Sequence, residues 1–228
     1  MTVTELSKGT KIYLLVGGKG ERLSSVTNGT PKPLVEVNGK PFIHYVLDTL
    51  YNSFEKGSQI SLVCSNETYS YFKDYRKLGI EVLNEGDNAG TGGFLSHIGI
   101  VGLPDSFYIM NGDTFFTGNL NLKVNKTTVF VANELVTPDV GYIKGKRGKV
   151  HEFVEKNPLA KGKEKVNLGI YKFYKKDISI PHPSRLPVSI EYDILPTIGN
   201  LNYKVLNTVR FDIGTPERLE KFKTWLPT

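Results

Sequence analysis

Glycines and two cations between residues 17 and 32 form a pattern suited to phosphate. Three glycines fall within four positions: Gly17, Gly18 and Gly20. Glycine lets backbone N–H groups come close to a phosphate or a base edge. Arg22 adds a donor fork that matches phosphate oxygens, and the prolines on either side of Lys32 restrict the direction of its backbone. The glycines alone also fit a plain tight turn, and the segment is neither a Walker A loop nor a dinucleotide fingerprint.

Two aspartates far apart in the sequence stand in turns. Asp113 ends an Asn-Gly-Asp triplet that follows an apolar run, and Asp212 opens an Asp-Ile-Gly turn. Carboxylates in such places often close Asx turns or cap helices. Thr215 could itself cap a last helix, with Pro216 at its first position. Position alone therefore leaves both a structural and a functional interpretation open for each aspartate.

The elements that would position these groups alternate between strand and helix. Compact apolar or β-branched runs predict strands at 11–16, 59–64, 80–83, 107–110, 127–133, 141–144, 150–154, 167–173 and 203–209. Helical spacing predicts helices at 41–54, 67–78, 92–101, 190–198 and 215–225. This alternation indicates an α/β fold with a largely parallel sheet covered on both faces. Ligands bind such sheets outside the carboxyl ends of the strands, where the segments after residues 16, 84 and 112 fall.

Bulk composition narrows the class of partner. The chain has 228 residues and a net charge of +6, but its lysines and arginines are scattered, so we expect no nucleic-acid partner. No apolar run approaches the roughly 18 residues that span a bilayer, and the first residues lack the apolar core of a secretory signal, so we expect no membrane association and a cytoplasmic location. The single cysteine, Cys64, lies in an apolar run and is expected to be a core thiol.

The motifs together resemble the signature of one family. Leu-Val-Gly-Gly-Lys-Gly-Glu-Arg-Leu at 15–23, Pro-Lys-Pro-Leu at 31–34 and Lys-Pro at 40–41 resemble the N-terminal signature of the sugar-1-phosphate nucleotidyltransferases. The resemblance continues in Gly-Thr-Gly-Gly at 90–93, Asn-Gly-Asp at 111–113, Phe-Val-Glu-Lys at 153–156, Asn-Leu-Gly-Ile-Tyr at 167–171 and Ser-Ile-Glu-Tyr-Asp at 189–193. The most similar subgroup is the heptose 1-phosphate and mannose 1-phosphate guanylyltransferases.

The resemblance implies a fold and a reaction. It implies a three-layer Rossmann-like nucleotidyltransferase fold with a mixed, mostly parallel central sheet. One catalytic domain would span residues 1–228, with a nucleotide-binding part at about 1–120 and a sugar-binding part at about 121–228. A sugar-phosphate oxygen would attack the α-phosphorus of a nucleoside triphosphate, giving a nucleotide sugar and pyrophosphate. Because the second pKa of a phosphate monoester is about 6, this nucleophile is already anionic and needs cations more than a base.

The resemblance also implies residue roles. Catalytic cations would be Arg22 and Lys32 on the triphosphate and Lys156 on the sugar phosphate. Nucleotide-binding residues would be Gly17, Gly18, Gly20, Glu85, Gly90 and Thr91. Sugar-binding residues would be Gly141, Glu155, Asn167 and Glu191. Asp113 and Asp212 would hold Mg²⁺, which prefers hard oxygen ligands and keeps several waters.

Glu85 bears on the choice of base. It lies five positions before Gly90, where the family places the residue that faces the base edge. An ionised carboxylate only accepts hydrogen bonds. Guanine presents two adjacent donors, whereas uracil and thymine present one donor flanked by carbonyl oxygens, so a carboxylate there favours GTP. A solvated glutamate at the end of a strand is the alternative.

Other functions stay open at this stage. A uridylyl-, thymidylyl- or cytidylyltransferase would differ in base and sugar. A glycosyltransferase would be expected to carry Asp-x-Asp after a strand, and residues 111–113 offer one carboxylate. A non-catalytic nucleotide-binding subunit would be expected to have lost one of Arg22, Lys32, Asp113, Lys156 or Asp212, all of which are present. The sequence leaves the sugar undetermined, and a homo-oligomer is possible.

Overall fold

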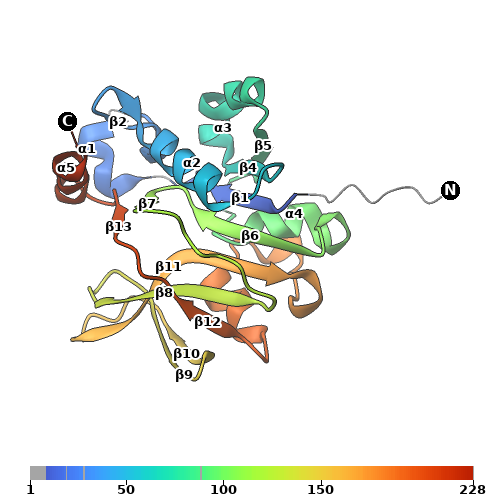
Figure 1. The fold of residues 1–228 in the computed structure, drawn as a ribbon. Helices are drawn as coiled ribbons and strands as arrows, with labels where there is room; N and C mark the ends of the chain where they lie inside the picture. Colours follow the sequence, from blue (N-terminus) through green and yellow to red (C-terminus); the bar gives the residue numbers. More distant parts are fainter. Residues whose placement is uncertain (1–8, 19, 28, 88, 228) are drawn as a thin grey trace.

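The computed structural model describes residues 9–18, 20–27, 29–87 and 89–227. One half of its main sheet is parallel (Figure 1). It consists of β5 (Glu81–Asn84), β4 (Gln59–Cys64), β1 (Lys11–Leu15) and β6 (Ser106–Asn111), in that order. The middle residues of β4, β1 and β6 are buried almost without interruption. Continuous apolar runs of this kind suit strands covered on both faces.

The other half of the sheet is mainly antiparallel. It continues from β6 through β11 (Lys163–Tyr174), β8 (Thr128–Leu135), β12 (Asn202–Val205), β10 (Lys149–Val154) and β9 (Tyr142–Lys146). Strand β11 runs antiparallel to both of its long neighbours, and only β12 and β8 pair in parallel. The mixed α/β sheet implied by the resemblance is confirmed. The expectation of a mostly parallel sheet holds only for the strands of the first half of the chain, because the rest of the sheet is mainly antiparallel.

Helices cover both faces of the sheet, which makes three layers. Along β1, Ile12 and Leu14 join a core that includes residues of α2 (Phe42–Ser53), α3 (Asn66–Phe72) and α5 (Pro216–Trp225). Tyr13 points to the opposite core, which includes residues of α4 (Gly93–Gly102). The alternation follows from the two-residue period of a strand. Cys64 is buried in the first core, as expected.

Three expected elements differ in detail, and the first is the strand expected at 203–209, which ends at Val205. The segment expected as a helix at 190–198 is a π-helical turn over Ile190–Ile194 followed by a 3₁₀ turn over Leu195–Thr197. The segment 67–78 starts as α3 and continues as a 3₁₀ helix over Lys73–Leu78. The cap of α5 is confirmed, because Thr215 Oγ1 accepts from the Arg218 N–H and Pro216 occupies the first helical position.

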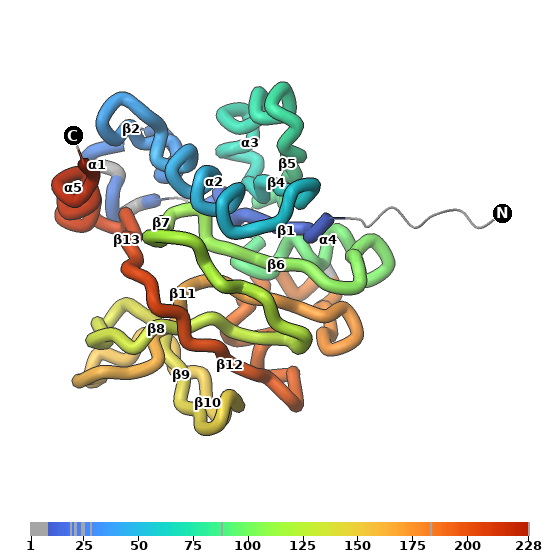
Figure 2. The backbone as a smooth tube through the Cα atoms, in the orientation of Figure 1, coloured from blue at the N-terminus to red at the C-terminus, as the bar shows by residue number. Residues whose placement is uncertain are grey.

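Short strands bring distant parts of the chain together. Strand β7 (Thr114–Phe116) pairs with β13 (Arg210–Asp212), and β2 (Glu36–Val37) pairs with β3 (Lys40–Pro41). Figure 2 traces the chain so that the neighbouring strands β7 and β13 can be followed from distant parts of the sequence, and the short helix α1 (Ser24–Thr27) precedes β2. None of the described helices is long and apolar enough to cross a bilayer. The division into two parts near residue 120 and a homo-oligomeric state stay predictions.

Candidate active site

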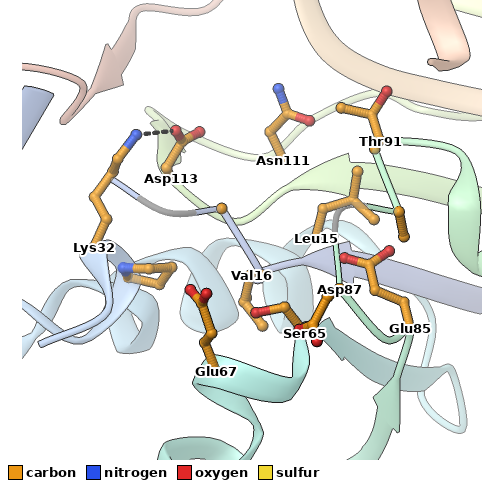
Figure 3. A pocket seen from close by; sticks show the side chains of 15 residues that line it. Leu15, Val16, Lys32, Ser65, Glu67, Glu85, Asp87, Thr91, Asn111 and Asp113 are labelled. Atoms are coloured by element: carbon orange, nitrogen blue, oxygen red, sulfur yellow. Dashed lines mark hydrogen bonds and ion pairs between the residues drawn. The ribbon is translucent and has the colours of Figure 1, made fainter. Parts of the chain in front are cut away.

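A cavity of about 360 Å³ opens at the carboxyl ends of the parallel strands (Figure 3). This volume is within the range of small-molecule sites. Many residues predicted for nucleotide and metal binding line it: Gly17, Gly18, Lys32, Glu85, Gly90, Thr91 and Asp113. The lining also includes Ser65, Glu67, Asp87 and Asn111, which the sequence motifs did not identify as site residues.

One end of the cavity is built around Glu85. Its carboxyl accepts from the Phe94 backbone N–H, and its Oε2 atom is buried with no hydrogen-bond partner among the described residues. Burial raises the pKa of Glu85 to about 7, an effect that the Phe94 bond only partly offsets. Gly17 packs so closely that a Cβ there would lie 2.8 Å from Glu85 Oε1 and 2.7 Å from the Ser65 backbone nitrogen. A buried acceptor without a donor is costly, so it marks a place where a ligand donor would be favourable.

The opposite end of the cavity holds a lysine–aspartate pair. Lys32 Nζ donates to Asp113 Oδ2 at 2.9 Å, and only 13% of the Lys32 side chain is exposed. Figure 3 shows this pair across the cavity from Glu85. Gly20 lies next to Lys32, since a Cβ on Gly20 would be 3.4 Å from that of the lysine. The Thr114 hydroxyl donates to the other oxygen of Asp113 at 3.1 Å.

Pairing of β7 with β13 places Asp212 next to the Asp113 turn. Asp212 is opposite Thr114 in the register, and the Ile213 N–H donates to the Asp113 carbonyl at 3.1 Å. The Asp212 Oδ1 atom accepts from Arg218 at 2.8 Å and from the Gly214 N–H at 3.2 Å. No hydrogen bond to Asp212 Oδ2 comes from the described residues.

This donor set fits a cation that brings its own water. No cluster of three or more His, Cys, Asp or Glu suited to a metal occurs in the part of the chain that the structure describes. Asp113 lines the cavity and Asp212 lies next to its turn without being part of the lining. Two neighbouring carboxylates suit Mg²⁺, which is usually held by one or two carboxylates, substrate phosphates and waters. Lys32 pairs with Asp113 and Arg218 pairs with Asp212, so each carboxylate is partly neutralised.

Arg22 lies outside the lining of the cavity. Its NH1 donates to Asp139 Oδ2 at 3.1 Å, and 61% of its side chain is exposed. Asp139 also accepts from Arg218 and from the Thr137 hydroxyl. Burial by itself would raise the pKa of Asp139, but these hydrogen bonds and the charge of Arg218 outweigh it and hold that pKa well below its usual range. The structure therefore joins Arg22 to the Asp212 region through an aspartate that the motifs did not reveal.

The predicted sugar-binding residues form a second group. Glu191 Oε1 accepts from the Tyr171 hydroxyl at 2.7 Å, and Tyr171 in turn accepts from the Asn167 amide at 2.7 Å. Glu191 Oε2 accepts from Thr91 Oγ1 at 3.0 Å. Because Thr91 lines the cavity, this bond connects the cavity to Glu191 and, through Tyr171, to β11. The fully buried hydroxyl of Tyr171 has its pKa raised well above its ordinary value by burial and by Glu191, so it serves as a neutral donor.

Glu155 is near this group. Burial raises the pKa of Glu155 to about 6; the nearby charge of Glu191 adds to the rise and Lys156 opposes it. Gly141 packs directly against the Glu155 carboxylate. Lys156 itself is exposed, has a left-handed backbone with φ of 50°, and forms no ion pair with the described residues. The structure thus brings Gly141, Glu155, Asn167 and Glu191 together and leaves Lys156 at the surface beside them.

Packing explains the middle residue of the Asn-Gly-Asp triplet. A Cβ on Gly112 would lie 2.7 Å from the Leu15 carbonyl oxygen and 2.7 Å from Val16 Cγ1. The Gly112 N–H donates to that same carbonyl at 2.9 Å. This close contact with the end of β1 holds Asn111 and Asp113 in the lining of the cavity.

A family model and two curated relatives match this chain. A family model described as nucleotidyl transferase matches residues 11–225. A D-glycero-alpha-D-manno-heptose 1-phosphate guanylyltransferase from Campylobacter jejuni is 32% identical over 52% of this chain and 55% of its own. The mannose-1-phosphate guanylyltransferase catalytic subunit beta from Drosophila pseudoobscura is 29% identical over 94% of this chain and 62% of its own. The chain therefore spans little more than half of the length of these curated relatives.

A solved structure is similar over nearly the whole chain. HddC from Yersinia pseudotuberculosis, crystallised in complex with GMP-PN, is 27% identical with a TM-score of 0.74. The match covers 93% of this chain and 97% of that one.

Proposed function

Since this chain belongs to the nucleotidyl transferase family, as its motifs predicted, we propose that it transfers a nucleotidyl group from a nucleoside triphosphate to a sugar 1-phosphate and releases pyrophosphate. The observation that carries the proposal is the Lys32–Asp113 pair at the strand-end cavity. The pair combines a lysine that can bind phosphate with a carboxylate that can bind a metal ion. It lies at the carboxyl ends of the strands, where α/β folds bind ligands.

The residues present suit a reaction between two anions. The sugar phosphate is already a nucleophile at neutral pH, so the protein must chiefly offset repulsion and the charge on the leaving pyrophosphate. Lys32 would turn from Asp113 to the triphosphate, and Arg22 would leave Asp139 to bind it as well. Lys156, which has no described ion pair, would take the phosphate of the sugar.

We infer that the reaction requires Mg²⁺. Asp113 and Asp212 would hold it, and the ion would supply charge neutralisation at the phosphates. Lys32, which pairs with Asp113 in this structure, would then be available to bind the phosphates of the nucleotide.

We propose GTP as the preferred nucleotide. The unpaired Oε2 of Glu85 supports this, because guanine offers two adjacent N–H donors to a carboxylate. The same pairing would stabilise the ionised form and lower the pKa of about 7. The guanylyltransferase names of two relatives and the GMP-PN bound to HddC agree with this choice.

The acceptor is proposed to be a heptose or mannose 1-phosphate. Glu155, Glu191 and Asn167 present carboxylate and amide oxygens that can accept from sugar hydroxyls. With a pKa of about 6, Glu155 is largely ionised at neutral pH and can accept from sugar hydroxyls with both oxygens. Under this proposal, these three residues determine which sugar is accepted, and Glu85 determines which base is accepted.

The test is a matrix of triphosphates and sugar 1-phosphates with Mg²⁺, with pyrophosphate release as the readout. GTP with mannose or heptose 1-phosphate should give the highest rate. Release of pyrophosphate from UTP, dTTP or CTP at a higher rate would move the base assignment to another nucleotide. No release in any combination, from a protein that binds GTP, would favour a non-catalytic subunit.

A further inference from the structure

Arg218 links two aspartates that come from distant parts of the chain. It lies in the first turn of α5. Its NH1 donates to Asp212 Oδ1 at 2.8 Å, and its NH2 contacts both carboxylate oxygens of Asp139 at 2.9 Å. Only 29% of the Arg218 side chain is exposed, against 61% for Arg22. Arg218 is therefore held firmly between two carboxylates, whereas Arg22 is free to leave.

Asp139 is the anchor of this arrangement. It stands in the loop between β8 and β9, and Thr137 Oγ1 in the same loop donates to it at 2.9 Å. If Arg22 moves to a triphosphate, Arg218 and Thr137 still hold the Asp139 carboxylate. The support of Arg218 thus does not depend on whether a nucleotide is bound.

We propose that Asp139 and Arg218 are positioning residues that orient Asp212 toward the divalent cation, an inference that rests on the proposed function. Arg218 occupies one oxygen of Asp212 and leaves Oδ2 for the ion. Asp139 holds the other nitrogen, so the guanidinium cannot turn both of its donors onto Asp212. The charge of Asp139 also offsets that of Arg218, which would otherwise repel a cation nearby.

The test replaces the anchor and compares it with a matched pair elsewhere. Asp139→Asn keeps the shape of the side chain and removes its charge. Glu134→Gln is the control, because Glu134 forms an ion pair with Arg210 at 2.8 Å and has a similar exposed fraction, 28% against 31% for Asp139. Asp212→Asn sets the scale for loss of a proposed ligand. Mn²⁺ binding is measured by electron paramagnetic resonance, with the ion alone and with GTP, and unfolding temperatures are recorded for every variant.

Asp139→Asn should weaken Mn²⁺ binding about tenfold, as is typical when a residue behind a metal ligand is lost. Its pyrophosphate release should recover at high Mn²⁺, which a distorted fold would not allow. Glu134→Gln should lower the unfolding temperature by a similar amount and leave Mn²⁺ affinity unchanged. Arg218→Lys should also weaken Mn²⁺ binding, because one ammonium cannot span both carboxylates.

Three results would each overturn the assignment: wild-type Mn²⁺ affinity in Asp139→Asn, an equal loss in Glu134→Gln, or Mn²⁺ binding that does not depend on Asp212. If the wild-type protein binds Mn²⁺ through Asp212 but releases no pyrophosphate from any substrate pair, the proposed function fails and the positioning role stands. If Asp139→Asn releases pyrophosphate normally and binds Mn²⁺ with unchanged affinity, the positioning role fails and the proposed function stands.

Discussion

Replacing Glu85 by glutamine should stabilise the nucleotide-free protein and reduce its preference for guanine. The pKa of Glu85 is about 7 in the folded protein, against an ordinary 4.5. The folded state therefore holds the proton more tightly than the unfolded state does. The contribution of Glu85 to stability is full below pH 4.5 and declines as the pH rises toward 7.

The size of this effect follows from the two pKa values. At about 1.4 kcal/mol per pH unit, the rise from 4.5 to about 7 costs the ionised folded state up to about 3 kcal/mol. Glu85→Gln is neutral at every pH and avoids this cost. Above pH 7 the variant should therefore be more stable than the wild type by up to about 3 kcal/mol, and the difference should vanish near pH 4.5.

Urea unfolding of both proteins between pH 4.5 and 8.5 measures the difference directly. The difference between the two free energies of unfolding removes the effect of other titrating groups that both proteins share, such as Asp139, whose pKa is held low. A flat difference, or a variant less stable than the wild type at pH 8, would refute the reasoning.

Nucleotide binding provides a second readout for Glu85. If guanine pairs with the carboxylate, GTP binding at pH 7 should release protons from the wild type and none from this position in Glu85→Gln. Calorimetry in buffers of different ionisation enthalpy measures that release. In the variant, the ratio of GTP affinity to UTP affinity should fall about tenfold, because one unpaired buried group costs about 1–3 kcal/mol. UTP binding that releases as many protons as GTP binding would contradict guanine recognition by Glu85.

Three further predictions concern other charged groups. Asp113→Ala should lower the rate of pyrophosphate release by orders of magnitude, and its far-ultraviolet circular dichroism spectrum should match that of the wild type. Full activity of Asp113→Ala, or full activity of the wild type in excess chelator, would contradict the metal assignment. Lys32→Ala should mainly weaken triphosphate binding and Lys156→Ala should mainly raise the KM for sugar phosphate, and steady-state kinetics with the two effects exchanged would reverse the roles. Lys172 is buried, donates to Ser106 and has its pKa lowered to about 8 by burial. Because the unfolded chain holds that proton up to about 10.5, the stability of the wild type relative to Lys172→Met, measured in urea, should rise between pH 8 and 10.5 by up to about 3 kcal/mol.

The parts of the fold that local sequence determines could be predicted. Strands β1, β4 and β6 are buried apolar runs, and their burial follows from composition alone. The same reasoning placed the motifs at the carboxyl ends of these strands, and the cavity lies there. Helix α2 and the Thr215 cap of α5 also depend on nearby residues only.

Features that depend on distant contacts could not be predicted in this way. Strands β7 and β13 have three residues each, too few for a periodic pattern, and their pairing joins segments almost a hundred residues apart. Asp139 and Arg218 belong to no motif. One follows a proline in a loop and the other resembles an ordinary helix-surface arginine, so only the folded chain shows that they meet. The π-helical turn at Ile190–Ile194 was expected as an ordinary helix because its apolar spacing is similar.

The tight packing of Gly112 against β1 has a consequence for how mutations in this region are interpreted. The triplet at 111–113 meets two separate requirements. Its outer residues present polar groups to the cavity, and its central residue must be glycine because a Cβ would not fit against the end of β1. Gly112→Ala would displace Leu15 and Val16 and inactivate the protein without removing any group that touches a substrate. A scan that ranked positions by lost turnover alone would record Gly112 as part of the chemistry. Only a parallel measurement of nucleotide affinity and folding would show that the defect begins in the packing of Gly112 against Leu15 and Val16.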